Sequence, residues 1–513
     1  MMNQNTRKEL NPETDTKLSS AAKRDEKKEE NEKKAIKAIS DSFNLFPDLP
    51  QGIRQVMETL EDHGEQAYLV GGCVRDARLG KKPHDYDLTT SARPEKVQAL
   101  FEKTIPTGIA HGTITVMTED GPMEVTTFRK EGQYQDHRHP DSVDFVTDLE
   151  EDLARRDFTI NAMAWNPKTG LVDPFGGQKD LEQGIIRAVG DPVRRFEEDA
   201  LRMLRAFRFA GRYGFKLDPK TKEAIDKLAP SISNVAVERT VPEVEEILLN
   251  SPQILDQMTA LFKPWIPELE VMLHTEQNSV YHYTDVLHHT IDALKNLPTK
   301  DPASAWALLL HDTGKPATHE FYDGHDHFKR HEVESEKIAR RVVKVLKLSR
   351  KMSEQIVQLV RYHDTFYKPN LKNLYKLRVL KGWPDEMVEK LFDVQYGDIM
   401  AHATHDRLAS LEAFRTFYEA EKNKHPLALN QLKINGRDVL ETTKLQGVQI
   451  SKALEAVLKE VILRPGLDTR QAQLNLLTQI AHRLIQEEAA TQADRKKEEC
   501  PHSKKEGSGQ NNA

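Results

Sequence analysis

Two aspartates two positions apart, Asp85 and Asp87, are the first residues of this sequence whose spacing could support chemistry. Side chains alternate between the two faces of a strand, so an extended segment would present both carboxylates on one face. Such oxygens are ligands that Mg²⁺ takes in sites that also hold substrate phosphates. A solvated edge strand, or a pair of Asx turns after Pro83, would explain the same residues, so the pair alone does not establish a metal site.

The residues just before this pair could hold phosphate. Gly71 and Gly72 follow the apolar run AYLV, and Arg75 falls near the start of a predicted helix. Glycines allow close approach of the backbone, and a helix N-terminus attracts anions, so the turn could bind a triphosphate. It matches neither a GxxxxGK[ST] loop nor a GxGxxG fingerprint.

A third carboxylate, Glu124, lies on another predicted strand that could run beside the first two aspartates. Three such acids could hold two metal ions, which activate an attacking hydroxyl and stabilise the leaving oxygen of a phosphoryl transfer. Glu124 could equally be the outward residue of an alternating strand.

The pattern of elements that must position these residues is α+β. Apolar alternation predicts a helix, several short strands and a hairpin up to residue 187, and a helical period of 3.6 follows to about residue 485. The two ends are charged, low-complexity segments that we interpret as disordered or as loose charged helices. The predicted domains are 1–44 (charged extension), 45–187 (α/β head), 188–250 (helical neck), 251–405 (helical body), 406–485 (helical tail) and 486–513 (charged end).

Composition limits the class of protein. A chain of 513 residues exceeds a single hydrophobic core, and its net charge of -7 argues against a uniformly basic nucleic-acid binder. Its two cysteines, Cys73 and Cys500, provide no disulfide framework. We see no secretory or transit signal and no apolar run of membrane-spanning length, and therefore predict a cytoplasmic protein without membrane contact.

Several ordered motifs resemble those of class II CCA-adding enzymes, the bacterial tRNA nucleotidyltransferases related to bacterial poly(A) polymerases. The resemblance covers roughly residues 46–250. It rests on LVGGCVRD with HDYDLTT, GIAHGTITV, EVTTFRKEGQYQDHRHPD, EEDLARRDFTINAMAWNP and EEDALRMLRAFRFAGRYGF.

The resemblance implies a polymerase-beta-like head that transfers nucleotides from CTP and ATP to the 3′ end of tRNA with Mg²⁺ and releases pyrophosphate. It implies catalytic roles for Asp85, Asp87 and Glu124, with Asp85 and Asp87 as the Mg²⁺ ligands. It also implies nucleotide contacts for Gly72, Arg75 and Arg156, and Asp157 is expected to fix Arg156.

Asp199 and Arg202 are expected to read the base, because the resemblance pairs both side chains with the Watson–Crick edge of the incoming nucleotide. Cytosine and adenine present an amino donor beside a ring-nitrogen acceptor, which suits a carboxylate beside a guanidinium. Uracil and guanine present the reverse pattern and would be rejected. Spacing alone favours a plain salt bridge between residues three apart on a helix. Arg205 and Arg208 continue the stripe and are expected near the phosphates, the ribose or the tRNA end.

A polar segment, residues 131–145, corresponds to the flexible loop that this family links to the switch from CTP to ATP. Its presence favours complete CCA addition or A addition alone, and does not separate the two.

The helical body resembles HD phosphohydrolases. His289, His311 with Asp312, and Asp398 match the metal ligands of that superfamily, and His331 and His363 fall where some of its members have further ligands. A second divalent metal is therefore expected there, although histidines that only pack helices would fit the same pattern. Whether this site hydrolyses a substrate stays open.

Three other functions fit parts of the sequence. A poly(A) polymerase shares the GG, DxD and RRDFTINA motifs, an HD phosphohydrolase with an inactive head would use only the histidines, and an RNA-binding module would use neither site. The last helices, within 406–485, are expected to bind the tRNA elbow. Oligomeric state is not predicted.

Overall fold

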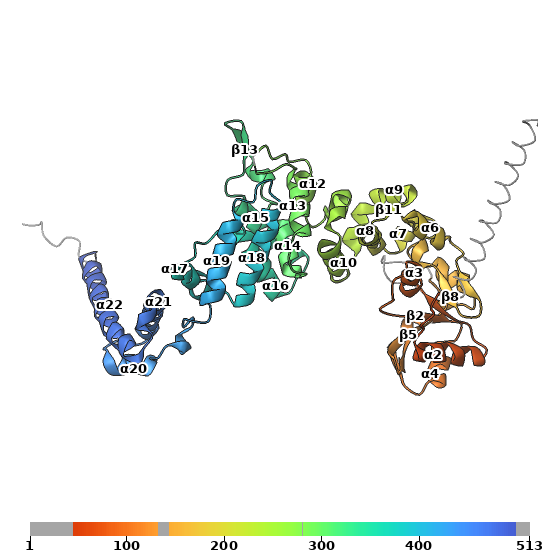
Figure 1. Ribbon diagram of the computed structural model, residues 1–513, viewed down its shortest axis with the longest axis horizontal. Helices are drawn as coiled ribbons and strands as arrows, with labels where there is room; N and C mark the ends of the chain where they lie inside the picture. The colour runs from red at the N-terminus through yellow and green to blue at the C-terminus, as the bar shows by residue number, and fades with distance from the viewer. Residues whose placement is uncertain (1–44, 132–142, 280, 499–513) are drawn as a thin grey trace, which may run out of the picture. The chain divides into compact units, whose positions relative to one another are not determined.

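The computed structural model describes residues 45–131, 143–279 and 281–498 (Figure 1). The chain divides into two compact units, Met1–Pro267 and Glu268–Ala513. A mixed sheet with helices forms most of the first unit, and the second is mainly helical. The predicted α+β class is therefore confirmed. Residues 1–44 and 499–513, predicted to be disordered, lie outside the described residues.

A seven-stranded sheet of order β3-β4-β5-β2-β1-β8-β9 organises the first unit. β2 pairs with β5 in parallel and the other neighbours are antiparallel, including the predicted β4–β5 hairpin. The strands are β1 Ala67–Val70, β2 Asp87–Thr90, β3 Thr104–Gly108, β4 Thr113–Thr118, β5 Gly121–Thr127, β8 Ala164–Asn166 and β9 Gly170–Val172. Most of these strands are rich in apolar and β-branched residues, which suits a sheet buried in its centre.

Short helices surround this sheet: α2 Gln51–Asp62, α3 Gly72–Arg78, α4 Pro94–Leu100, α5 Leu149–Ala154 and α6 Gly177–Gln183. Val70, Phe128 and Leu153 belong to a core between the sheet and α5. β6 Arg129–Glu131 and β7 Val143–Phe145 pair on either side of residues 132–142. Those residues, most of the predicted switching loop, lie outside the described part of the chain.

The rest of the first unit is helical, with α7 Pro192–Glu198, α8 Leu201–Tyr213, α9 Pro219–Leu228, α10 Val237–Asn250 and α11 Thr259–Phe262. α8 packs against α10 and ends at Gly214, whose φ of +68° is a left-handed cap that glycine adopts without strain. β10 Ile185–Ile186 and β11 Lys216–Leu217 form a small parallel pair, so this region is not wholly helical as predicted.

The second unit contains α12 Glu268–Met272, α13 Val286–Lys295, α14 Pro302–Leu310, α15 His331–Val345, α16 Arg350–Tyr362, α17 Leu371–Tyr375, α18 Asp385–Met400, α19 Leu408–Glu421, α20 Gly436–Thr442, α21 Val448–Leu463 and α22 Arg470–Glu498. The sequence of α14, PASAWALLL, is apolar on every side, and such a helix must be central. It contacts α13, α16 and α18, and its C-terminal end holds His311.

One sequence prediction fails in this unit. The predicted all-helical stretch contains a hairpin, β12 Glu320–Tyr322 with β13 His325–His327. Its turn residues, Asp323 and Gly324, have φ of +53° and +77°, as an Asp-Gly hairpin turn requires. The charged end from residue 486, for which a loose charged helix was the alternative to disorder, is helical as far as Glu498, and its alanines and long charged residues favour helix.

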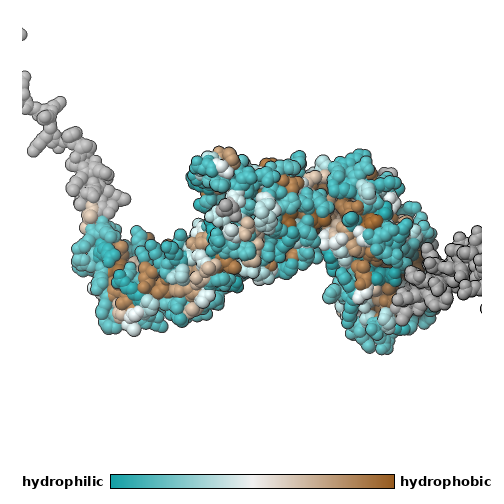
Figure 2. Space-filling view, turned by 45° about the horizontal axis from the view of Figure 1, so that its top comes forward, coloured by the Kyte–Doolittle hydropathy of each residue, from teal (hydrophilic) through white to brown (hydrophobic). Residues whose placement is uncertain are grey.

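Most residues on the face shown in Figure 2 are hydrophilic, with narrower hydrophobic areas between them. Among the C-terminal helices, Leu440 and Val448 are 56% and 74% exposed. Within the described residues, no helix combines the length and the apolar character that crossing a membrane would need.

Candidate active site

The three predicted catalytic carboxylates line one cavity of about 620 Å³. Asp87 opens β2 and is the register partner of Glu124 on the parallel strand β5. Register partners on adjacent strands project to the same face, so these two side chains share one face of the sheet. Asp85 lies in a bend before β2, not in the strand itself as predicted, yet it lines the same cavity.

Asp87 in this cavity is influenced by a nearby carboxylate, Asp85, and by a nearby positive charge, Arg156. Partial burial raises the pKa of the Asp87 carboxyl above its ordinary value, the Arg156 charge opposes that shift, and Asp85 adds to it. Two neighbouring carboxylates disfavour each other's ionised forms unless a cation lies near them. The donor set, all carboxylate oxygen, therefore suits a hard divalent ion.

Arg156 reaches this region past the turn between β1 and α3. Gly71 has a φ of +71°, and a Cβ added there would lie 2.9 Å from Nη1 of Arg156. Glycine at this position therefore satisfies both the backbone and the approach of the guanidinium. Burial lowers the pKa of Arg156. Asp152 opposes this shift, because one of its carboxylate oxygens lies 3.6 Å from Nη2 of Arg156.

Arg75 connects the same turn to α8. It donates to Oδ1 of Asn161 at 2.6 Å and to Oδ1 of Asp76 at 2.9 Å, and its guanidinium lies 5.2 Å from the ring centres of Phe209 and Tyr213. Gly72 begins α3, where an added Cβ would stand 3.7 Å from Nη2 of Arg75. The predicted phosphate-binding arginine is thus itself buried and held by the surrounding fold.

Cys73, inside this turn, should resist thiol reagents. Its Sγ donates to the carbonyl of Val70 at 3.2 Å, and burial raises the pKa of the thiol to about 12. The reactive species is the thiolate, and an unfolded cysteine ionises near pH 8.5. Between about pH 8.5 and about pH 12, folding therefore keeps Cys73 neutral. In a Cys500→Ser chain we expect negligible labelling by iodoacetamide at pH 8 and complete labelling in denaturant, measured by mass spectrometry. Rapid stoichiometric labelling of the native chain would contradict this.

The proposed base-reading residues are not bonded to each other in the way that spacing alone suggests. Asp199 has an extended backbone between α7 and α8, and its Oδ1 accepts from the backbone N–H of Leu201. Its carboxylate binds both terminal nitrogens of Arg239, from α10, at 3.2 and 2.7 Å. The intrahelical salt bridge between Asp199 and Arg202 that spacing alone favours is therefore not formed in this structure.

Arg202 has its own partners. Its Nη1 donates to Oε2 of Glu198 at 2.9 Å and to the carbonyl of Arg195 at 3.1 Å, and Nη2 donates to the carbonyl of Arg155 at 3.2 Å. The side chain is thereby held at the start of α8 without using Asp199.

Arg205 and Arg208 continue along α8 and also have carboxylate partners. Arg205 binds Oδ2 of Asp157 at 2.8 Å, and Nε of Arg208 lies 2.6 Å from Oε2 of Glu243. Although burial opposes it, Arg205 and Asn161 lower the pKa of Asp157 to about 2. Asp157, expected to fix Arg156, bonds directly to Arg205 and acts on Arg156 through its charge.

The predicted HD residues come together in the second unit. Nε2 of His289, on α13, lies 2.9 Å from Oδ1 of Asp398 on α18, and Nε2 of His311 lies 3.1 Å from Oδ2 of Asp312 and 3.5 Å from Oδ1 of Asp398. All four side chains are buried. Burial alone would lower the pKa of His311, but the two aspartates raise it to about 10.

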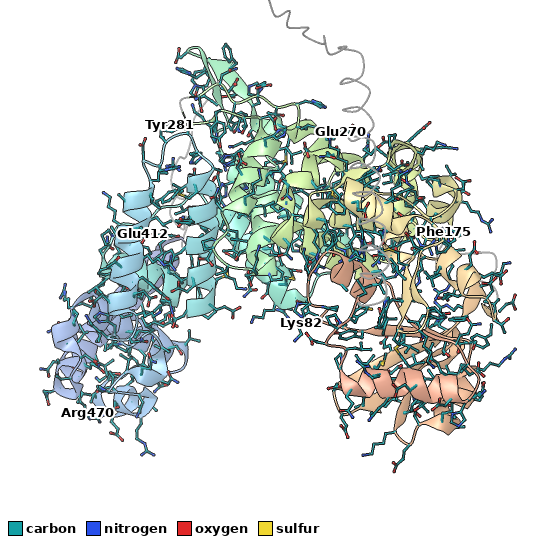
Figure 3. All side chains as sticks on the ribbon, turned by 45° about the vertical axis from the view of Figure 1, so that its right-hand side comes forward. Lys82, Phe175, Glu270, Tyr281, Glu412 and Arg470 are labelled. Carbon is teal, nitrogen blue, oxygen red and sulfur yellow. The ribbon has the colours of Figure 1, made fainter. Side chains whose placement is uncertain are left out.

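His331 and His363 add a second group beside the first. Nε2 of His331 lies 3.3 Å from the other oxygen of Asp312 and 3.2 Å from Nε2 of His363. Asp312 therefore faces one group with each oxygen, which is the arrangement that a bridging carboxylate needs. An adjoining cavity of about 480 Å³ is lined by Asp312, Asp398, His331, His363 and Tyr281, the last of which is labelled in Figure 3.

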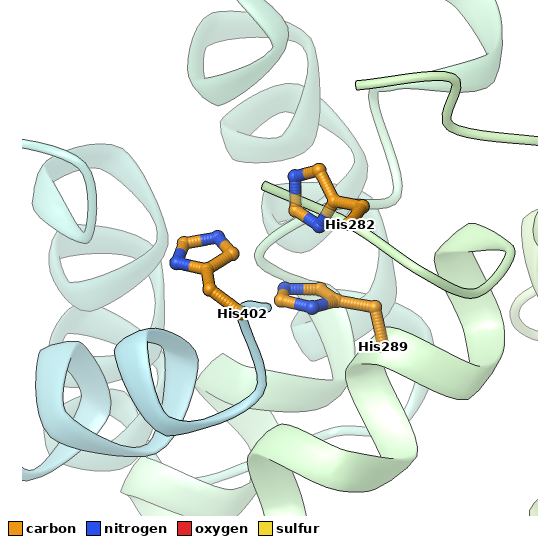
Figure 4. Close-up of side chains that lie close together, drawn as sticks. All are labelled: His282, His289 and His402. Carbon is orange, nitrogen blue, oxygen red and sulfur yellow. The ribbon is translucent and has the colours of Figure 1, made fainter. Parts of the chain in front are cut away.

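Two further histidines, His282 and His402, were not predicted. Together with His289 they form a third group whose ligand atoms lie within 4.8 Å of one another (Figure 4). Burial lowers the pKa of His282 to about 2 and of His402 to about 4, so both rings are neutral. His402 lies just past the end of α18, four residues after Asp398, and this short separation in sequence was the available signal.

Profiles of three protein families match this chain. They are described as the Poly A polymerase head domain over residues 67–187, the probable RNA and SrmB-binding site of polymerase A over 214–273, and the HD domain over 280–394. Together with the fold, these matches define a polymerase-type nucleotidyltransferase head followed by an HD domain.

Similarity to individual known proteins identifies the family more closely. The chain is 34% identical to the CCA-adding enzyme of Anoxybacillus flavithermus over 417 residues, 80% of this chain and 92% of that one. It is 51% identical to the Lactiplantibacillus plantarum enzyme over 199 residues, 39% of this chain and about half (49%) of the relative. The structure of the Bacillus stearothermophilus CCA-adding enzyme in complex with CTP matches with a TM-score of 0.63 and 29% identity, covering 86% of this chain and 98% of that one.

The chain therefore belongs to the family of CCA-adding enzymes, which are tRNA nucleotidyltransferases. The predicted family and enzyme class are confirmed. The domain boundaries at residues 250 and 405 stay predictions, since the RNA-binding profile runs to residue 273 and the HD profile ends at 394.

Proposed function

We propose that this protein adds C, C and A to the 3′ end of tRNA from CTP and ATP without a nucleic-acid template. In each cycle the terminal 3′-oxygen bonds to the α-phosphorus, the bond between the α- and β-phosphates breaks, pyrophosphate leaves and the hydroxyl proton is lost. One observation carries the proposal: Asp199 and Arg202 are each held in place by hydrogen bonds to other residues, and each still has hydrogen-bonding capacity left.

Counting hydrogen bonds supports the base-reading role. Asp199 uses three of about four acceptor sites, on Leu201 and Arg239, and one acceptor site is left. Arg202 uses three of its five N–H donors, which leaves two. A remaining acceptor on Asp199 and remaining donors on Arg202 are the groups that the amino group and ring nitrogen of cytosine or adenine would need. Uracil and guanine would place a carbonyl against the carboxylate and an N–H against the guanidinium.

Asp85, Asp87 and Glu124 fit Mg²⁺ and are the residues that would hold it in the head. When bound, Mg²⁺ neutralises charge on the triphosphate and favours ionisation of the attacking hydroxyl. Arg156, close to Asp87 and Gly71, would place a fixed positive charge beside the phosphates.

The remaining head residues would contribute mainly by position. Arg75 would support the turn that begins with Gly72, since it is held between Asn161 and the aromatic rings of α8. Arg205 and Arg208 would face the nucleotide or the tRNA end from α8, with Asp157 and Glu243 orienting them. The helices from residue 406 onward would bind the tRNA elbow. We place this reaction in the cytoplasm, where tRNA and both nucleotides are available.

Three tRNA substrates test the proposal, ending before CCA, after the first C and after CC, each with one labelled nucleotide. We expect C on the first two, A on the third, and no extension beyond the complete end. Addition of A only, onto the third, would show an A-adding enzyme. Long adenylate tails on arbitrary RNA would show a poly(A) polymerase, and absence of both C and A incorporation would reject the proposal.

A second, accessory function is favoured by the mutual contacts of His289, His311, Asp312 and Asp398. The two aspartates also line the adjoining cavity. We propose a metal-dependent phosphohydrolase there, whose ligands would bind a divalent metal and activate water. With Mn²⁺ and p-nitrophenyl phosphate, hydrolysis should disappear in His311→Ala and persist in Asp85→Ala. Hydrolysis that depends on Asp85 and not on His311 would reject it.

A further inference from the structure

His282, His289 and His402 come from three separate parts of the second unit and meet around one point (Figure 4). His282 precedes α13, His289 lies on α13, and His402 follows α18. Their ring centres are 4.8, 4.8 and 5.1 Å apart. Three imidazoles around one ion at the usual zinc–nitrogen distance would have centres roughly 5 Å apart.

Unpartnered ring nitrogens are the second observation. His289 is 1% exposed, and its Nδ1, like Nδ1 of His282, is buried without a hydrogen-bond partner among the described residues. A buried polar atom without a partner costs free energy, and in native structures it calls for a specific cause such as an absent ion.

Neither extra histidine is needed for the HD ligand groups. Those groups are His289, His311 and Asp312 on one side and Asp312, His331 and His363 on the other. His402 lies 3.8 Å from Oδ1 of Asp398, which is itself closer to His289. Packing alone would not require three imidazoles to bring their ligand atoms together, with two of the rings, His282 and His402, lining a cavity.

From this geometry we infer a third metal-binding position, formed by His282, His289 and His402, that takes a transition metal such as Zn²⁺ or Co²⁺. Imidazole nitrogens suit these ions, whereas Mg²⁺ prefers oxygen ligands. His282 and His402 line the cavity of about 480 Å³, so one coordination position would remain open to water or a substrate phosphate. Nε2 of His289 faces Asp398 in the HD centre and its Nδ1 is the unpartnered nitrogen, so this ring would bind both ions as an imidazolate whose proton is released to solvent. Because His289 is shared, the inference rests on the proposed HD metal centre.

Metal content tests this inference directly. The full-length protein is loaded with Co²⁺, passed over a desalting column and measured by mass spectrometry of the metal, and its visible absorption is recorded. We expect the His282→Ala/His402→Ala variant to lose one ion per chain relative to wild type. The His331→Ala/His363→Ala variant should lose a different one, and the combined variant both. His325→Ala/His327→Ala is the matched control, since these residues line the same cavity outside the three groups.

The outcomes separate this position from the HD centre. Unchanged cobalt content and spectrum in His282→Ala/His402→Ala would overturn the third position, even if the HD hydrolase is active. Loss of all cobalt in that variant, with the wild-type melting temperature of the metal-free protein, would also overturn it, because one shared site would then explain the binding. A wild-type chain that binds no cobalt would reject both proposals, and tRNA extension should be the same in every variant.

Discussion

An Asp87→Asn variant should lose C and A incorporation by roughly three orders of magnitude, because removal of one metal-binding carboxylate costs several kcal/mol of transition-state stabilisation. Asparagine keeps the size of the side chain and the start of β2, so the fold and tRNA binding should persist. The measurement is single-turnover extension of tRNA lacking its CCA end, together with the dissociation constant for tRNA.

Asp62→Asn, an exposed carboxylate at the end of α2, is the control and should match wild type. If Asp87→Asn extends tRNA within threefold of the wild-type rate, the carboxylate cavity is not the site of the reaction. The effect should also spare hydrolysis at the histidines of the second unit.

The sequence predicted the spatial position best for residues on strands, where the alternation of side chains determines which face each residue occupies. Glu124 was expected beside the aspartates, and the parallel register of β2 and β5 pairs it with Asp87. Asp85 lies just outside β2, because the strand begins only at Asp87. Alternation along a sequence predicts a face, but the end of a strand depends on its neighbours in the sheet.

The helical side chains were harder to predict because their partners are distant. Spacing predicted a bond between Asp199 and Arg202, whereas Asp199 binds Arg239, forty positions later, and Arg202 binds Glu198. The backbone at Asp199 is extended, so the i to i+3 relation of a helix does not apply there. Only the packing of α8 against α10 shows this.

The histidine-rich body shows the same limit. The HD pattern in the sequence identified His289, His311, Asp312 and Asp398 as a group, and in the structure these residues contact one another. His282 lies outside any regular helix, so no periodicity could assign it to this cluster. Its place becomes clear only from the loop before α13.

An Asp199→Ala variant should lose base discrimination much more than tRNA binding. Its carboxylate would accept from the amino group of cytosine or adenine, and a hydrogen bond to a charged group contributes about 1.5–3 kcal/mol. We therefore expect the ratio of kcat/KM for CTP to that for UTP to fall by roughly 10- to 100-fold. The measurement uses one tRNA that ends before CCA, with both nucleotides.

Arg239→Ala separates reading from positioning. It removes the bidentate partner of Asp199 but leaves the carboxylate, which still accepts from Leu201. We expect a smaller loss of discrimination than in Asp199→Ala, with Asp226→Ala, an exposed carboxylate on α9, unchanged. If Asp199→Ala discriminates between CTP and UTP as well as wild type does, Asp199 only caps α8 and pairs with Arg239, and the base must be read elsewhere.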